Sequence, residues 1–172
     1  MSHREEVKSA TMPRDIRAFE RAVQDTAKAD HKSRQQGRQS SWEWLGWGDH
    51  RVAITGAKNR LGFGFKVPNA GYTAVLHHPE LTQESDLLPG GRLHQRLLSG
   101  QLELALSTDS YAVPAYEAGL AKLMHPGGAY AASVIYMQAE QSGLSWETQV
   151  LADGSVEITV DAPEQMVDWL TV

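Results

Sequence analysis

The 172-residue sequence predicts one compact α+β domain. Three observations favour this class: an amphipathic helical pattern near the N-terminus, short β-branched and aromatic runs divided by glycine and proline turns, and two helical patterns followed by a C-terminal hairpin. A chain of this length buries roughly two thirds of the surface of its unfolded form, so we expect it to fold without covalent crosslinks.

The first expected element is a helix over residues 14–29. Its apolar side chains recur at three- and four-residue spacing and define one face: Ile16, Phe19 and Val23. Residues 30–41 contain no apolar side chain, so we expect a flexible polar connection there. The predicted organisation is therefore an N-terminal helix with its linker over 1–41, followed by a single α+β domain over 42–172.

An antiparallel meander is expected to follow the linker. Residues 52–55 and 61–67 are rich in β-branched and aromatic side chains, and the glycine-containing stretch 56–60 between them supplies a turn. After a Pro-Asn-Ala-Gly turn, residues 72–77 continue as a third strand. Residues 101–106 alternate polar and apolar side chains and are compatible with a strand or with a helical continuation.

The remainder of the chain predicts short helices and a hairpin. Helical apolar spacing, proline at a first turn or glycine after the last residue indicate four helices: 93–98, 114–124, 129–142 and 165–170. Asp153-Gly154 tolerates the positive φ of a tight turn, so we expect residues 144–151 and 155–160 to pair as antiparallel strands.

Part of this pattern resembles a known family. The start Met1-Ser2-His3 and the stretch 129–160 are similar to small proteins of cyanobacteria and red-algal plastids, the family of unknown function called hypothetical chloroplast reading frame thirty-five. There a Y-A-x-x-x-V helix leads through glycine into a strand, an Asp-Gly-Ser turn and a last strand. The corresponding residues here are Tyr130, Ala131, Gly143, Asp153, Gly154 and Ser155. The resemblance implies a ferredoxin-like two-layer sandwich with helices on one face of an antiparallel sheet, and it implies no catalytic residue.

Composition and charge narrow the classes of function. The absence of cysteine excludes disulfides, thiolate metal sites and thiol nucleophiles. With no export signal and no apolar run long enough for a bilayer, we expect a soluble cytoplasmic protein with no membrane partner. The net charge of −5 divides into plus three over residues 1–40 and minus eight over residues 41–172. A mildly basic arm with interspersed acids is a weak footprint for nucleic acid.

No motif in the sequence assembles a catalytic centre. Gly62 and Gly64 lie inside an expected strand and lack the further glycine and the lysine of a phosphate loop, so they favour strand curvature or close packing. The adjacent His77 and His78 point to opposite faces of a strand, and no histidine pair has the spacing of a metal motif. No G-x-S-x-G turn is present. We expect no catalytic residue, no metal and no cofactor.

Recognition of a protein partner is the function that these observations favour, with the protein as a non-enzymatic adaptor. The expected contacts are the apolar helix face and the tryptophans after the linker: Ile16, Phe19, Val23, Trp42, Trp44 and Trp47. An alternative is single-stranded nucleic-acid binding, with bases stacked on the tryptophans beside Arg51, Arg60 and Lys66. Two further alternatives are an immunity-type inhibitor of a toxin and a small enzyme with a histidine and acid site.

Overall fold

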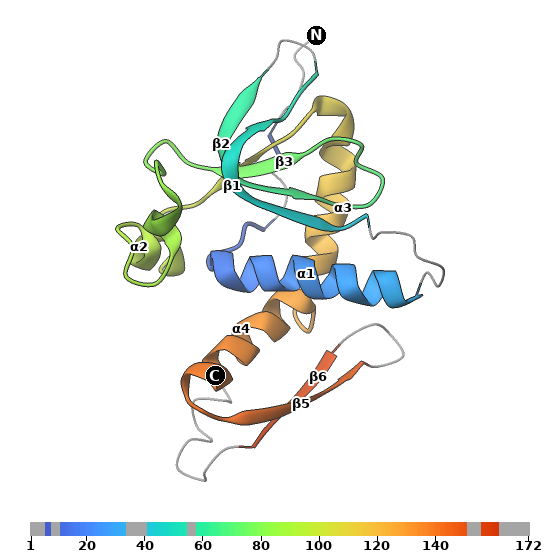
Figure 1. Ribbon diagram of the computed structural model, residues 1–172, viewed down its shortest axis with the longest axis vertical. Coiled ribbons are helices and arrows are strands. Elements are labelled where there is room, and N and C mark those ends of the chain that lie inside the picture. The colour runs from blue at the N-terminus through green and yellow to red at the C-terminus, as the bar shows by residue number, and fades with distance from the viewer. Residues whose placement is uncertain (1–5, 8–10, 34–40, 55–57, 151–155, 162–172) are drawn as a thin grey trace.

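A computed structural model describes residues 6–7, 11–33, 41–54, 58–150 and 156–161. Helices and antiparallel strands combine in it, which confirms the predicted α+β class (Figure 1). The elements in chain order are α1 (Ile16–Ser33), β1 (Glu43–Arg51), β2 (Asn59–Lys66), β3 (Ala74–His77), η1 (Glu84–Leu87), α2 (His94–Leu98), β4 (Ala105–Ser107), η2 (Ser110–Ala112), α3 (Val113–Met124), α4 (Ala129–Gln141), β5 (Ser145–Val150) and β6 (Val156–Asp161).

Four strands form the main sheet in the order β1-β2-β3-β4, and every neighbouring pair is antiparallel. Because this order follows the chain, the sheet is a meander, whereas a ferredoxin-like sandwich has split β-α-β crossovers. Residues 6–7 pair with the β4 edge, where the amide of Val7 donates to the carbonyl of Leu106 at 3.0 Å. The expected antiparallel sheet is present, with simpler connections than the resemblance implied.

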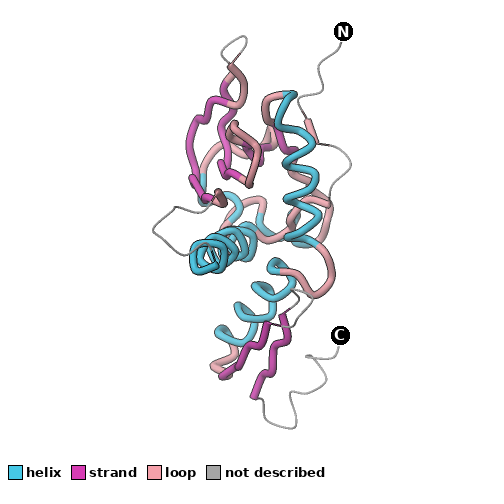
Figure 2. Tube along the Cα trace, turned by 90° about the vertical axis from the view of Figure 1, so that its right-hand side faces the viewer, coloured by secondary structure: helices cyan, strands magenta, loops and turns pink. Residues whose placement is uncertain are grey.

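Helix α1 lies in the middle of the molecule, with the main sheet on one side and α4 on the other (Figures 1 and 2). Its apolar face is fully buried: Ile16, Phe19 and Val23. The Phe19 ring packs against Phe65 at 5.1 Å between centroids, Trp44 at 6.0 Å and Tyr130 at 6.5 Å. This corrects the expectation of a separable arm over 1–41, because the main sheet and α4 both pack against α1.

The tryptophans expected at a docking surface also belong to the interior. Trp42 is 4% exposed, and the ring of Trp44 stacks on Phe63 with centroids 6.1 Å apart. Trp47 meets the same ring edge-on at 5.2 Å. A β-bulge after Trp44, at Gly46 with φ of 77°, lets both indoles face the core although they are three residues apart. Trp42 is buried, and Trp44 and Trp47 are half-buried with their rings packed against the core.

On the face of the main sheet that points away from Phe63 and Phe65, Gly64 leaves room for the ring of His50. A Cβ on Gly64 would lie 2.8 Å from Nε2 of His50, so a larger residue there would displace the His50 ring. That nitrogen donates to the carbonyl of Gly46 at 2.9 Å. Close packing is thus the role of the glycine pair, and His50 is held by a local backbone bond.

The long connection between β3 and β4 is organised by one buried carboxylate. Asp86 accepts bonds from the amides of Thr82 and Gln83 at 3.1 and 3.3 Å and from Nη2 of Arg92 at 3.3 Å. Glu80 and Arg96 add a two-pronged ion pair with both N···O distances 3.0 Å. These bonds hold α2 against residues 80–86 of the same connection, and α2 forms one wall of the pocket described below.

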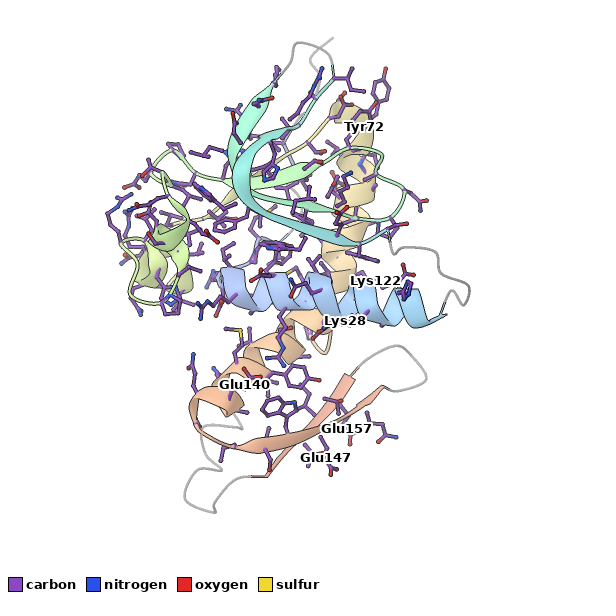
Figure 3. The ribbon with its side chains drawn as sticks, in the orientation of Figure 1. Lys28, Tyr72, Lys122, Glu140, Glu147 and Glu157 are labelled. Carbon is purple, nitrogen blue, oxygen red and sulfur yellow. The ribbon has the colours of Figure 1, made fainter. Side chains whose placement is uncertain are left out.

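A two-stranded hairpin, β5-β6, packs on the far side of α4. The rings of Trp146 and Tyr136 lie 5.5 Å apart, and the Arg21 guanidinium lies 4.8 Å from the Tyr136 centroid. Two acidic side chains on exposed positions of the hairpin are labelled in Figure 3: Glu147 and Glu157. The predicted C-terminal hairpin is confirmed, since its strands differ from the expected bounds by one residue at each end.

Most expected helices are present, with shifted ends. Helix α1 extends to Ser33, beyond the expected end at residue 29, and β1 precedes the expected strand at 52–55. The expected terminal helix over 165–170 lies outside the described residues. Among the described helices, none is both long enough and apolar enough to cross a membrane.

Candidate functional site

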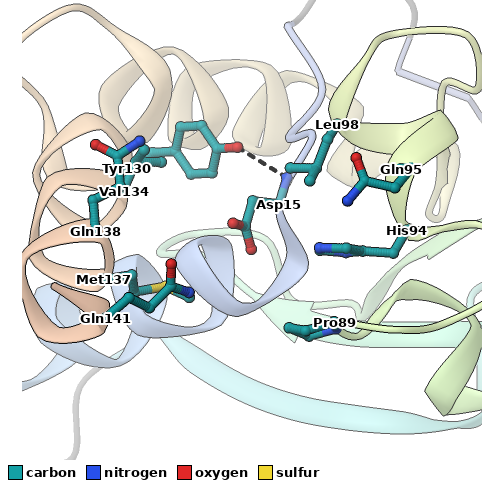
Figure 4. Close-up of a pocket in the computed structure, with 10 residues that line it drawn as sticks. All are labelled: Asp15, Pro89, His94, Gln95, Leu98, Tyr130, Val134, Met137, Gln138 and Gln141. Atoms are coloured by element: carbon teal, nitrogen blue, oxygen red, sulfur yellow. Dashed lines mark hydrogen bonds between the residues drawn. The ribbon is translucent and has the colours of Figure 1, made fainter. Parts of the chain in front are cut away.

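A pocket of about 390 Å³ opens where the start of α1, the α2 segment and α4 meet (Figure 4). Six polar and four apolar residues line it: Asp15, Pro89, His94, Gln95, Leu98, Tyr130, Val134, Met137, Gln138 and Gln141. Its walls come from three segments that are far apart in the sequence.

Tyr130 and Asp15 are fixed together at the end of the pocket formed by the start of α1. The Tyr130 hydroxyl oxygen accepts the backbone amides of Arg14 at 3.1 Å and Asp15 at 3.0 Å, and Figure 4 shows the bond to Asp15. Asp15 in turn caps the helix, because its Oδ1 accepts the amide of Ala18 at 3.1 Å. Burial raises the pKa of the Tyr130 phenol, so the phenol keeps its proton at neutral pH and can donate it.

The α2 wall presents an imidazole and an amide. Nδ1 of His94 lies 3.0 Å from the Leu87 carbonyl, which only accepts, so Nδ1 carries a proton and the neutral ring has its lone pair on Nε2. The His94 ring and the Gln95 amide both point toward the space that holds the Asp15 carboxylate (Figure 4). The network around Asp86 fixes this wall to residues 80–86 of the same connection.

The α4 wall is one face of a helix. Tyr130 and four residues at successive helical steps contribute to it: Val134, Met137, Gln138 and Gln141. Val134 and Met137 provide a half-buried apolar surface, while the two glutamines are exposed at the rim. The pocket therefore combines an apolar wall with hydrogen-bonding groups, the usual composition of a small-molecule site.

The basic residues expected to contact nucleic acid do not gather on one surface. The Arg51 guanidinium donates to the carbonyls of Ala53 at 3.2 Å and Ile54 at 3.1 Å. Arg60 and Lys66 lie near opposite ends of β2. With Trp42 buried and the rings of Trp44 and Trp47 packed on the core, the described residues do not form the expected basic stacking platform.

One serine and one histidine have the spacing of a nucleophile and its base. Oγ of Ser107 lies 2.7 Å from Nε2 of His77. Ser107 is 3% exposed, so its hydroxyl has no room for an acyl substrate, and the pair stabilises the junction of β3 and β4. Burial and then the nearby Arg60 lower the pKa of His77. No group of three or more histidine or acidic side chains within the described ranges is placed to hold a metal ion.

Comparison with protein-family models, with curated proteins and with solved structures finds no match. The pocket is therefore the feature of the molecule that points to a function. Sequence reasoning missed Asp15 and His94, because neither stands in a recognisable motif and the fold alone brings them together. The regular spacing of Tyr130, Val134 and Met137 was visible, but it indicates a helix face whether that face meets the core or a ligand.

Proposed function

We propose that the protein binds a small polar ligand, of metabolite size, in the pocket between α1, α2 and α4. The observation that carries the proposal is the convergence of hydrogen-bonding groups on one hollow, most of whose side chains make no bond to one another. Within the described part of the chain, the side-chain amides of Gln95, Gln138 and Gln141 and the Nε2 of His94 make no hydrogen bond.

Size and composition support a small ligand. A volume of about 390 Å³ lies at the lower end of the range, on the order of 300–1,000 Å³, found for ligand sites. Leu98, Val134 and Met137 supply apolar surface that excludes water around a ligand, and the polar groups around them orient it. Binding by hydrogen bonds is what a carboxylate, an imidazole, a phenol and amides in this arrangement can do.

Binding of a protein partner, the function that the sequence favoured, would need a surface other than the α1 face and the tryptophans. Ile16, Phe19, Val23 and Trp42 are enclosed in the core, and a partner cannot reach them without unfolding the domain. The pocket, in contrast, is open to solvent in the folded protein.

The test is a fragment screen on the full chain by NMR, observing the labelled methyl group of Met137. Fragments should shift this resonance in the wild-type protein. Leu98→Trp, a substitution at a 38% exposed lining position, should fill the pocket and abolish the shifts. The matched control is Leu61→Trp, at a 43% exposed position of β2 outside the pocket, which should leave them unchanged. If no fragment shifts Met137, or if Leu98→Trp binds like the wild type, the proposal is wrong.

A further inference from the structure

We infer that the pocket selects ligands that carry a protonated amine next to a short apolar group. The inference rests on the proposed function, and it names the chemical class of the ligand.

The only full charge in the lining is negative. Asp15 is half-buried, and the lining contains no lysine or arginine. The arginines of the neighbouring connection are engaged elsewhere, Arg92 with Asp86 at 3.3 Å and Arg96 with Glu80 at 3.0 Å. The Arg14 guanidinium packs against Gly100, whose Cβ position would lie 2.9 Å from Cζ. Within the described residues, no cation pairs with the Asp15 carboxylate.

Four of the amides around the start of α1 are already engaged, although helix N-termini commonly bind anions. The amides of Arg14 and Asp15 already donate to Tyr130, and those of Ala18 and Phe19 donate to the side chain and the carbonyl of Asp15. The helix dipole contributes about half a positive charge at this end, which is less than the full negative charge of the carboxylate. Among the side chains that line the pocket the net charge is negative, while the Arg14 guanidinium, whose charge acts on Tyr130, lies outside the lining.

Two of the groups that remain offer only acceptors at their free atoms. Asp15 uses Oδ1 for its cap and keeps its second oxygen, while His94 presents the lone pair of Nε2. The amides of Gln95 and Gln141 each bring one oxygen acceptor and one NH2 donor to the same pocket (Figure 4). An ammonium group has three donors and no acceptor, so it complements this set. Beside it, the surface of Leu98, Val134 and Met137 suits a short hydrocarbon or an aromatic ring.

Three probes with the same ring and different charge test the inference: phenethylamine, phenethyl alcohol and hydrocinnamate. Titrated at pH 7 and followed at the Met137 methyl, the amine should bind about tenfold more tightly than the alcohol, because a charge-assisted bond is about twice as strong as a neutral one. Hydrocinnamate, which is an anion, should bind most weakly.

Asp15→Asn separates the charge from the fold. Asparagine caps helices as well as aspartate does, so the helix start should be retained and the melting temperature should change little. The preference for the amine over the alcohol should fall to about onefold. Asp25→Asn is the matched control on the same helix: Asp25 is partly exposed and lies outside the pocket, 3.8 Å from Arg21, and its loss should leave the preference at about tenfold.

The outcomes distinguish the two proposals. Equal affinity for the amine and the alcohol in the wild type, a preference that survives Asp15→Asn, or one that Asp25→Asn also removes would overturn the inference about charge. The pocket itself would still stand if any probe bound and Leu98→Trp abolished that binding. If none of the probes and no other fragment bound, the proposed function would fail together with the inference.

Discussion

Replacement of Tyr130 by phenylalanine tests the bond network that builds the pocket. The substitution removes one oxygen that accepts two backbone amides, those of Arg14 and Asp15, at 3.1 and 3.0 Å. The ring stays, and so does its packing against Phe19. The change therefore isolates the contribution of these two hydrogen bonds to the attachment of α4 to the start of α1.

The expected loss follows from the surroundings of the two amides. A typical hydrogen bond contributes about 1 kcal/mol net. Water can reach the amide of Arg14, which is exposed, but reaches that of the half-buried Asp15 less well. We therefore expect Tyr130→Phe to lower the free energy of unfolding by about 1–2 kcal/mol. For a chain of this size, that corresponds to roughly 3–6 °C in melting temperature.

Urea denaturation and calorimetry of the full chain measure this loss. Tyr136→Phe is the matched control, because Tyr136 lies on the same helix and its hydroxyl makes no hydrogen bond within the described residues. It should change the free energy of unfolding by no more than about 0.5 kcal/mol. Equal losses for the two variants would refute the role assigned to the Tyr130 hydroxyl.

Two further predictions concern the core and the sheet. Deletion of residues 1–41 should abolish cooperative unfolding and NMR dispersion, because it removes the buried Ile16, Phe19 and Val23; a folded remainder would contradict the central position of α1. In the folded protein the pKa of His77 lies below its ordinary 6.5, so the unfolded chain binds a proton on His77 more tightly than the folded chain does. The stability that comes from keeping His77 neutral is therefore fully present above pH 6.5 and is lost as the pH falls below it. When the free energy of unfolding is measured by urea titration at several pH values, it should fall less steeply with decreasing pH in His77→Gln than in the wild type. An equal slope in the two proteins would contradict the prediction.

Helices and turns were predictable from the sequence because their signals are local. The apolar spacing of Ile16, Phe19 and Val23 and the Asp153-Gly154 dipeptide correctly indicated α1 and the last hairpin. The same local information cannot say which surface an apolar face meets. An amphipathic helix before a polar stretch looks like an arm, yet here both the sheet and α4 pack on it.

The first strand was misplaced for an equally physical reason. Its sequence, EWLGWGDHR, contains two glycines and lacks regular alternation, so it does not indicate a strand. The bulge at Gly46 adds one residue and restores the core orientation of the second indole. Only pairing with β2, a tertiary effect, makes this segment a strand.

The pocket was beyond sequence reasoning because capping bonds between distant segments create it. The start of α1 extends past the sheet, and its amides need acceptors that the sheet does not provide. Tyr130 from α4 and the carboxylate of Asp15 meet this need, and the α2 segment, held by Asp86, closes the third side. The residues that cap the start of α1, Asp15 and Tyr130, thus form the polar end of the pocket. Alanine at position 15 would remove the cap and the charge together, whereas asparagine removes only the charge, so only asparagine can show whether the pocket recognises a cation.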